Sequence, residues 1–136
     1  MSVVRAREPE TLDAVTLEVL WTRMISIVDE AAKAIVRTSF STLSNEANDF
    51  ACMLTDARGL ALAQNTGSIP SFIGTLPATV RHFLAAMGPE GMRPGDVLIT
   101  NDAWMGPGHM SDVSVPKNIP GVTVKPIVVK FEEASL

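Results

Sequence analysis

The longest uninterrupted pattern in the sequence covers residues 13–39, which contain no glycine and no proline. Within this segment, apolar residues recur at the i, i+3, i+4 and i+7 spacing of an amphipathic helix. Asp13 is placed to cap the start of this helix, and Arg37 lies near its end, where a positive charge favours the helix dipole. The segment therefore predicts one long helix, whose apolar side contains Leu17, Leu20, Trp21, Met24, Ile27, Val28, Ala31 and Ile35.

A helix of this length would extend roughly 40 Å at about 1.5 Å per residue. That is long for a chain of 136 residues. We expect the helix either to pack across a larger protein body or to contact another chain. Trp21 and Met24 lie on its apolar side and are expected to be core residues rather than ligand contacts.

The middle of the chain predicts a β-hairpin followed by a second helix. Residues 49–55 and 60–64 are apolar runs separated by Asp-Ala-Arg-Gly, which favours a tight reversal. A polar connector at residues 39–49 precedes the hairpin, a loop at residues 65–71 follows it, and helical spacing resumes over residues 74–87. The single cysteine, Cys52, lies in the first run and is expected to be a buried, unreactive thiol.

The most chemically informative stretch follows a second turn-rich segment. Residues 96–100 are a short β-branched run that predicts a buried strand, and the chain then enters a loop rich in Gly, Pro, Asn and Asp. Because His109 and Asp112 are three residues apart, their side chains could bind one ion of zinc, manganese, iron or magnesium. The alternative is an ordinary turn, in which Asp and Asn side chains bond to their own backbone.

The other histidine, His82, lies in the second predicted helix, with no Cys, Asp or Glu at ligand spacing. A histidine on a helix face in this setting is more often structural or solvent-exposed than a ligand. We therefore do not assign His82 to the site.

Several blocks of the sequence resemble one known family. The segment NDAWMGPGHMSDVSV is similar to the N-D-P-[YW]-x-G-[GT]-[TG]-H-x-x-D-[VI] signature of the hydantoinase B family. That family includes oxoprolinase halves and the large subunits of acetone and acetophenone carboxylases. Three upstream blocks occur in the family's order from about residue 12: LDAVTLEVLWTRMISIVDEAAKAIVRTSFS, NEANDFACMLTDARGLALAQ and IPSFIGTLPATVRHFL.

The resemblance implies a role for each polar residue of the loop. His109 and Asp112 correspond to ligands of a divalent metal, with manganese, zinc or iron as candidates. Asp102 would lie beside the metal or face the substrate, as a catalytic residue that orients the His109 side chain. Trp104 would either line the substrate pocket or pack under the loop. The family's third ligand comes from a downstream histidine-rich motif, but no histidine follows His109 in this sequence.

The resemblance also implies the chemistry and the partner. Family members open cyclic amides such as hydantoins or 5-oxoproline, or carboxylate ketones, at the expense of ATP. A hydantoinase A-type subunit usually handles the ATP, so we expect a hetero-oligomer; consistently, this sequence contains no G-x-x-x-x-G-K-[ST] loop. We expect the chain to be an N-terminal fragment of such a metal-dependent subunit, inactive alone. The alternative is a non-catalytic assembly module that docks on such a complex.

The predicted elements give an α+β fold, an incomplete part of a larger domain. A long helix, a hairpin, a second helix and a strand lead to the site loop. We divide the chain into a flexible arm at residues 1–12, a hydantoinase B-like region at 13–115 and a divergent, truncated tail at 116–136. In that tail Pro116, Pro120 and Pro126 are expected to interrupt further strand, because proline cannot donate to a β-ladder.

Composition excludes two classes of partner. The formal net charge is −4, and the 11 basic residues are not clustered, so neither nucleic acid nor an anionic membrane surface is expected to bind. No apolar run has the length needed to cross a bilayer, and the N-terminal residues do not resemble a secretory signal. We therefore expect a cytoplasmic location.

Overall fold

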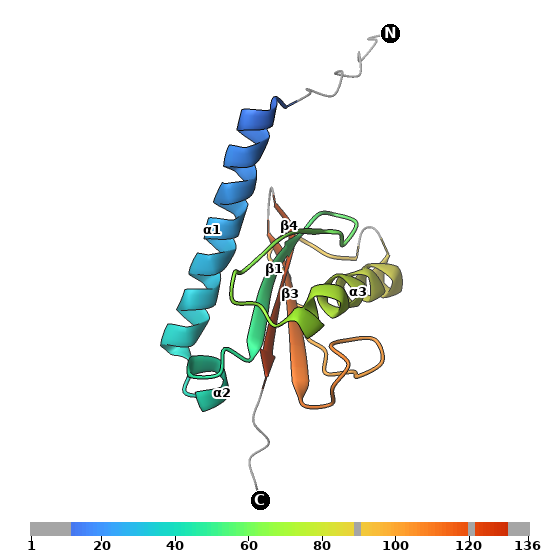
Figure 1. Cartoon of the computed structure of the whole chain (residues 1–136). Coiled ribbons are helices and arrows are strands. Elements are labelled where there is room, and N and C mark those ends of the chain that lie inside the picture. Colours follow the sequence, from blue (N-terminus) through green and yellow to red (C-terminus); the bar gives the residue numbers. More distant parts are fainter. Residues whose placement is uncertain (1–11, 89–90, 120–121, 131–136) are drawn as a thin grey trace, which may run out of the picture.

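A four-stranded antiparallel sheet lies between two helices in the computed structural model, which describes residues 12–88, 91–119 and 122–130 (Figure 1). The strand order is β2-β1-β4-β3. This is the α+β class that the sequence predicts. In chain order the elements are α1 (Ala14–Thr38), α2 (Thr42–Asn45), β1 (Phe50–Thr55), β2 (Ala61–Gln64), α3 (Pro70–Met87), β3 (Asp112–Ile119) and β4 (Val122–Lys130).

Helix α1 begins where the sequence predicts. The carboxylate of Asp13 accepts hydrogen bonds from the backbone N–H groups of Val15 and Thr16, both at 3.0 Å, and so caps the helix. These bonds stabilise the ionised form, and the Thr16 side chain and backbone make the largest contribution to lowering the pKa of Asp13 below its ordinary value.

The two halves of α1 have different surroundings. In its C-terminal half, Val28 and Ala32 are buried in a cluster with Phe50 and Cys52 of β1. The N-terminal half extends past the edge of the sheet, as Figure 1 shows. The side chain of Trp21 is consequently 55 % exposed, so the prediction that it is a core residue is wrong. Met24, nearer the sheet, packs against the core as predicted.

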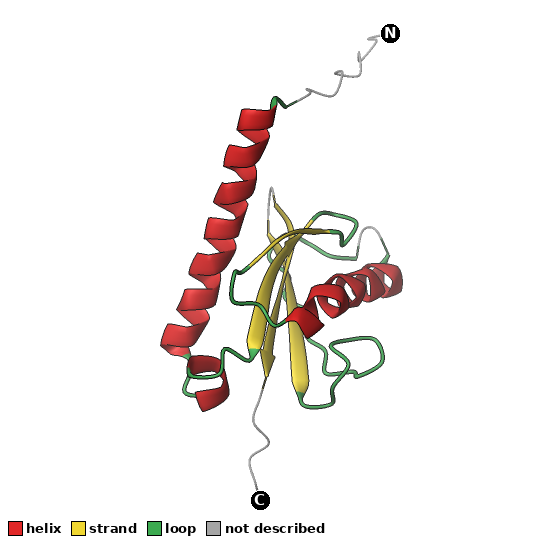
Figure 2. Cartoon of the chain, viewed as in Figure 1, coloured by secondary structure: helices red, strands yellow, loops and turns green. Residues whose placement is uncertain are grey.

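Strand β1 is buried on both faces, which explains its unbroken apolar sequence. Phe50, Cys52 and Leu54 contact the α1 side of the sheet. Ala51 and Met53 point to the opposite side, where they pack against Phe72 and Leu76 of α3. The helices therefore cover opposite faces of the sheet (Figure 2), and the predicted burial of Cys52 is confirmed. No helix in the described part of the chain is both long and apolar enough to span a membrane.

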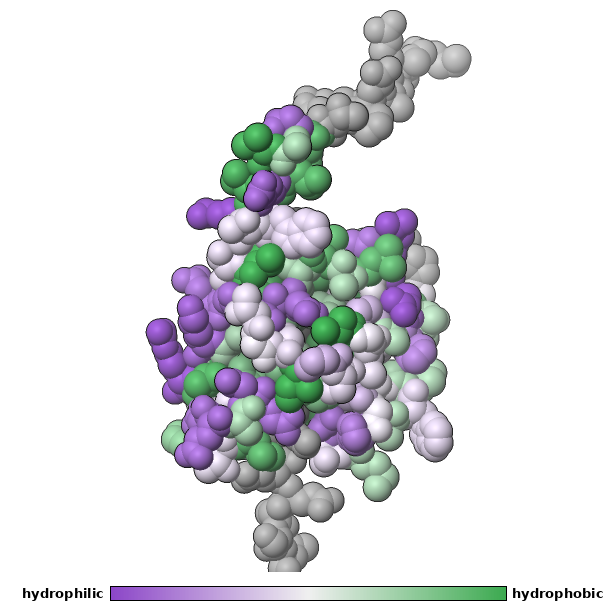
Figure 3. Space-filling model, viewed as in Figure 1, coloured by the Kyte–Doolittle hydropathy of each residue, from purple (hydrophilic) through white to green (hydrophobic). Residues whose placement is uncertain are grey.

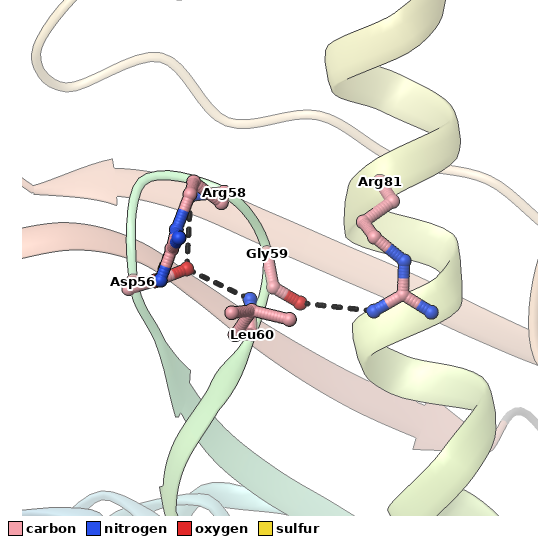
Figure 4. A network of polar contacts seen from close by, with 5 residues as sticks. All are labelled: Asp56, Arg58, Gly59, Leu60 and Arg81. Atoms are coloured by element: carbon pink, nitrogen blue, oxygen red, sulfur yellow. Dashed lines mark hydrogen bonds and ion pairs between the residues drawn. The ribbon is translucent and has the colours of Figure 1, made fainter.

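The turn of the predicted β1–β2 hairpin is built around Asp56 (Figure 4). Its carboxylate accepts hydrogen bonds from the backbone N–H of Leu60 at 2.8 Å and of Arg58 at 2.9 Å. These bonds, chiefly the one from Leu60, lower the pKa of Asp56. Gly59 has a φ of +76°, and its carbonyl oxygen accepts a hydrogen bond from Nη1 of Arg81 on α3 at 3.4 Å. The turn is thereby tied to the second helix.

Two connecting segments are more ordered than predicted. Helix α3 begins at Pro70, four residues before the predicted start at 74, so part of the expected 65–71 loop is helical. Proline suits the first turn of a helix, because the N–H that it lacks would have no partner there. The polar connector at residues 39–49 contains the short helix α2, in which Ser44 is fully buried.

The prediction that prolines interrupt the strands after Val115 is wrong for Pro116 and Pro126, and Pro120 lies outside the described residues. Pro116 of β3 and Pro126 of β4 lie directly opposite each other in the ladder. The carbonyl oxygen of Pro116 accepts from the N–H of Leu98 at 2.8 Å, on the side away from β4. Because the N–H and C=O of one strand residue point to the same side, the N–H that Pro116 lacks is not needed for pairing with β4.

Residues 96–100 are not the buried strand that we predicted. They pair irregularly with the outer side of β3, through isolated bridges from Val97 to Lys117 and from Thr100 to Ser114. Val97 and Ile99 are exposed, whereas Leu98 and Thr100 are partly buried. This alternation is typical of an edge segment with only one face covered.

Candidate functional site

The two ends of the site loop, residues 101–111, are held close together by backbone hydrogen bonds. Thr100 and Ser114 exchange two backbone hydrogen bonds, of 3.0 Å and 2.8 Å. Because Ala51 and Ser114 both lie opposite Val128 of β4, Ser114 is on the sheet face that α3 covers. The loop therefore emerges beside α3 and returns into the first residue of β3.

Asp102 builds the first turn of the site loop. Its carboxylate oxygen Oδ1 accepts from the backbone N–H groups of Trp104 at 2.8 Å and Met105 at 3.1 Å. This is the turn-forming role that the sequence left open as the alternative to a catalytic one. Gly106 is required close by, since a Cβ atom there would lie 2.5 Å from the carbonyl oxygen of Asp102.

His82 makes a structural contact with the site loop. Its Nδ1 atom lies 2.7 Å from the carbonyl oxygen of Met105. The carbonyl can only accept, so Nδ1 must carry the hydrogen. Thr79, His82, Phe83 and Ala86 share one side of α3 at helical spacing. The helical spacing of these residues could have indicated that they form one surface of α3. It does not reveal which loop packs on that surface.

A cavity lies between α3 and the site loop. It is lined by Thr79, His82, Phe83, Ala86, Thr100 and Met105, and has a volume of about 200 Å³. Apart from the imidazole of His82 and the threonine hydroxyls, its lining consists of hydrocarbon and thioether groups. Such a space suits a small, mainly apolar ligand with one polar group.

The two predicted metal ligands are close in the backbone but differ in environment. The N–H of Asp112 donates to the carbonyl oxygen of His109 at 3.3 Å, which closes a turn immediately before β3. His109 is exposed to solvent. Asp112 has an exposed fraction of 0 %, on the α3 side of the sheet. A buried carboxylate is costly unless polar or charged partners compensate it, and Asp112 does interact with a partner in the fold.

The described residues do not complete a metal site. In the described ranges, no group of three or more His, Cys, Asp or Glu side chains is arranged to hold an ion. A catalytic zinc site normally uses three protein ligands, whereas His109 and Asp112 supply two. The donor types suit a divalent metal, but the set is incomplete.

The tip of the site loop presents large side chains to solvent. Trp104 is 92 % exposed, so the prediction that it packs under the loop is wrong, and Met110 is also exposed. Trp104 is not among the residues that line the cavity beside α3. An exposed tryptophan beside a candidate site is a plausible contact for a partner or for a ligand outside the cavity.

A protein-family model that matches most of the chain identifies its family. The family model described as Hydantoinase B/oxoprolinase matches residues 13–128. The chain belongs to the hydantoinase B/oxoprolinase family. This confirms the resemblance seen in the site loop and in the three upstream blocks.

Named hydantoinase B/oxoprolinase relatives are much longer than this chain. It is 35 % identical over 103 residues to 5-oxoprolinase 1 of Arabidopsis thaliana, covering 76 % of this chain and 8 % of the relative. It is 33 % identical over 104 residues to the 5-oxoprolinase of Dictyostelium discoideum, again covering 76 % of this chain and 8 % of the relative. The chain therefore spans less than a tenth of the length of these two relatives.

A solved structure shows the same fold as this hydantoinase B/oxoprolinase chain. The nucleotide-free structure of acetone carboxylase superposes with a TM-score of 0.75 at 20 % identity, over 87 % of this chain and 16 % of the other. The likeness supports the arrangement of helices and sheet described above.

Proposed function

We propose that this chain supplies part of the metal-dependent centre of a hydantoinase B-type enzyme. The complete enzyme would use ATP, bound by a hydantoinase A-type partner, to hydrolyse a cyclic amide or to carboxylate a ketone. The observation that carries the proposal is the turn at the start of β3, which holds the buried Asp112 next to His109. Family membership supports it independently.

In this proposal, His109 and Asp112 contribute one nitrogen and one oxygen donor to a manganese, zinc or iron ion. The remaining ligands come from outside the described residues, and such a metal would supply Lewis-acid polarisation of a carbonyl oxygen. The chain alone is expected to bind metal weakly and to lack turnover, because affinity depends on the number of ligands and their preorganisation.

Paramagnetic broadening by Mn²⁺ tests the ligand assignment in this chain. Titrated Mn²⁺ should broaden the backbone amide signals of residues 109–113 first. In His109→Ala this selective broadening should disappear without loss of fold, because His109 is exposed. His82→Asn is the matched control, since it removes the other histidine, and should retain the broadening. Unchanged broadening in His109→Ala would overturn the assignment.

Asp102 has a supporting role in this proposal. Since its carboxylate already accepts two backbone hydrogen bonds within the site loop, we assign it to holding the loop in place beside the metal. Any contact with substrate would have to use its other oxygen, Oδ2. The effect of Asp102 on catalysis would then act through the position of His109 and its neighbours.

A second candidate function is that of an assembly module. The N-terminal half of α1 presents Leu17, Leu20 and Trp21, which are exposed, and Figure 3 shows hydrophobic side chains gathered at that end of the helix. An exposed apolar surface of this kind favours contact with another polypeptide. Co-elution with a hydantoinase A-type subunit, lost in Trp21→Ser, would support this function; independent elution of the wild-type chain would oppose it.

A further inference from the structure

A second cavity lies on the sheet face that α1 covers, away from the site loop. It is lined by residues of α1, by Asn48 and Phe50 at the start of β1, and by the loop that follows β2. Phe50 belongs to the core cluster on the α1 side of the sheet, so this cavity is separate from the one beside His82. Its volume of about 290 Å³ holds roughly ten water molecules at about 30 Å³ each, and is close to the lower limit for a small-molecule site.

The cavity is lined by a buried amide whose donor is unused. Asn65 has an exposed fraction of 5 %. Its Oδ1 atom accepts hydrogen bonds from the backbone N–H of Cys52, at 2.8 Å, and from the hydroxyl of Ser68, which fixes the orientation of the amide. No group in the described part of the chain accepts a hydrogen bond from Nδ2. Asn65 therefore offers two N–H donors to a molecule in the cavity.

Gly67 keeps this donor accessible. A Cβ atom on Gly67 would lie 3.8 Å from Nδ2 of Asn65, so a side chain at this position would lie against the amide. The φ angle of Gly67 is outside the positive range that favours glycine, so the backbone conformation alone does not require this residue type. The missing side chain instead leaves space beside Nδ2.

Two opposite charges on successive turns of α1, Asp29 and Lys33, line the same cavity. Oδ1 of Asp29 accepts from the backbone N–H of Thr66 at 2.8 Å and from its hydroxyl at 3.1 Å. Oδ2 of Asp29 receives only a longer bond of 3.3 Å from that hydroxyl, and so retains a lone pair for another donor. Within the described residues, neither Asp29 nor Lys33 forms an ion pair, so both charges are available to a ligand.

We propose that this cavity binds the zwitterion of a small α-amino acid with an apolar side chain. The ligand carboxylate accepts from Nζ of Lys33 and Nδ2 of Asn65, and the ligand ammonium group donates to Oδ2 of Asp29. Ala32 and Val36 provide apolar surface for the ligand side chain. A simple carboxylate would lie beside the like charge of Asp29, and a simple amine beside that of Lys33, whereas a zwitterion complements both. This inference goes beyond the proposed function and does not depend on it.

Three probes of similar shape test the proposal on the wild-type chain. They are L-leucine, 4-methylpentanoate, which lacks the ammonium group, and 3-methylbutylamine, which lacks the carboxylate. Binding is followed at neutral pH by the backbone amide signals of Asn48, Thr66 and Gly67. We expect L-leucine to shift these signals saturably and to bind about three- to tenfold more tightly than either analogue, as the loss of one charge-assisted contact at a partly exposed site implies. Absence of a saturable shift, or an analogue that binds as tightly as L-leucine, would overturn the proposal.

Lys33→Met and Arg37→Met separate a specific contact from a general effect of charge. Both substitutions remove an exposed cation from α1, but only Lys33 lines the cavity. Lys33→Met should weaken the binding of L-leucine about three- to tenfold, and Arg37→Met should leave the affinity unchanged. Equal affinities of the two variants would contradict the assignment of Lys33 and overturn the site.

Asn65→Asp tests the buried donor. The aspartate keeps an acceptor oxygen for the N–H of Cys52, but it replaces the donor by a second acceptor that repels the ligand carboxylate. The saturable shifts of Thr66 and Gly67 should therefore be lost, and an unchanged affinity for L-leucine would overturn the inference. Should the buried charge unfold this variant, Lys33→Met decides the question, because Lys33 is exposed and its replacement leaves the core intact.

Discussion

The carbonyl oxygen of Gly59 accepts a hydrogen bond from Nη1 of Arg81, which joins the tip of the β1–β2 hairpin to helix α3 (Figure 4). The two residues are also in close steric contact. A Cβ atom on Gly59 would lie 2.9 Å from Cγ of Arg81 and 3.3 Å from its backbone nitrogen. The hairpin can approach the helix this closely only because residue 59 has no side chain.

Gly59→Ala should destabilise the protein by roughly 1–3 kcal/mol, because an alanine would be strained at positive φ and would push the turn away from α3. The free energy of unfolding from urea titration measures this effect. Gly74→Ala is the control: it lies within α3 with open space around its Cβ position, and should stabilise by about 0.5–1 kcal/mol. Equal effects of the two substitutions would contradict the contact.

A valine-to-alanine substitution should affect the free energy of unfolding differently in the two halves of α1. Val28 is 2 % exposed and Val19 is 56 % exposed. Val28→Ala should cost about 1.5–3 kcal/mol through lost burial and a small cavity. Val19→Ala should be neutral or stabilise by up to about 0.5 kcal/mol, because alanine is the better helix former. Urea unfolding checks both, and a comparable loss in Val19→Ala would show that another surface already covers that half in solution.

Acid should lower the stability of the fold because it protonates two carboxylates that accept backbone hydrogen bonds, those of Asp13 and Asp56. The pKa values of Asp13 and Asp56 are lowered from 3.8 by hydrogen bonds that exist only in the folded chain. Their stabilisation is therefore complete above that value and is lost as pH falls through the folded pKa values. Asp13→Asn keeps a capping oxygen without a titrating proton, so its melting temperature should fall less steeply with acid than that of the wild type. Identical slopes would exclude a contribution from Asp13.

Asp102→Ala and Asp102→Asn should separate a turn-forming role from a catalytic one. The alanine variant loses the acceptor for the N–H groups of Trp104 and Met105, so hydrogen exchange of those amides should quicken while global unfolding changes little. The asparagine variant keeps an acceptor oxygen and should restore slow exchange. In the complete enzyme, activity that Asp102→Asn restores indicates positioning, whereas activity that it fails to restore indicates a need for the charge.

The sequence predicted the elements that depend on local pattern. The start of α1 at Asp13, the hairpin around Asp56 and the burial of Cys52 all follow from capping, turn and hydrophobic signals within a few residues. The two later strands could not be predicted in the same way. Whether Pro116 damages a strand depends on which side of β3 needs an N–H, and that is set by its neighbours in the sheet.

The sequence identified candidate residues of the site, but not how they are arranged in space. Motif spacing identified His109 and Asp112, but His109 is exposed, whereas Asp112 is fully buried on the sheet face that α3 covers. The contact between His82 and Met105 joins residues 23 positions apart, and neither residue carries a local signal for it. Long-range packing decides both features.

The position of β4 between β1 and β3 has a consequence for the order of assembly. Phe50 pairs with Val129, so β1 finds its central partner only after almost eighty further residues have left the ribosome. Until then the nascent chain carries a hairpin with one apolar edge uncovered, which is the state most prone to pairing with the wrong strand. Productive folding of this region should therefore wait until β4 has been made, and should be sensitive to chaperones that shield β1 until then.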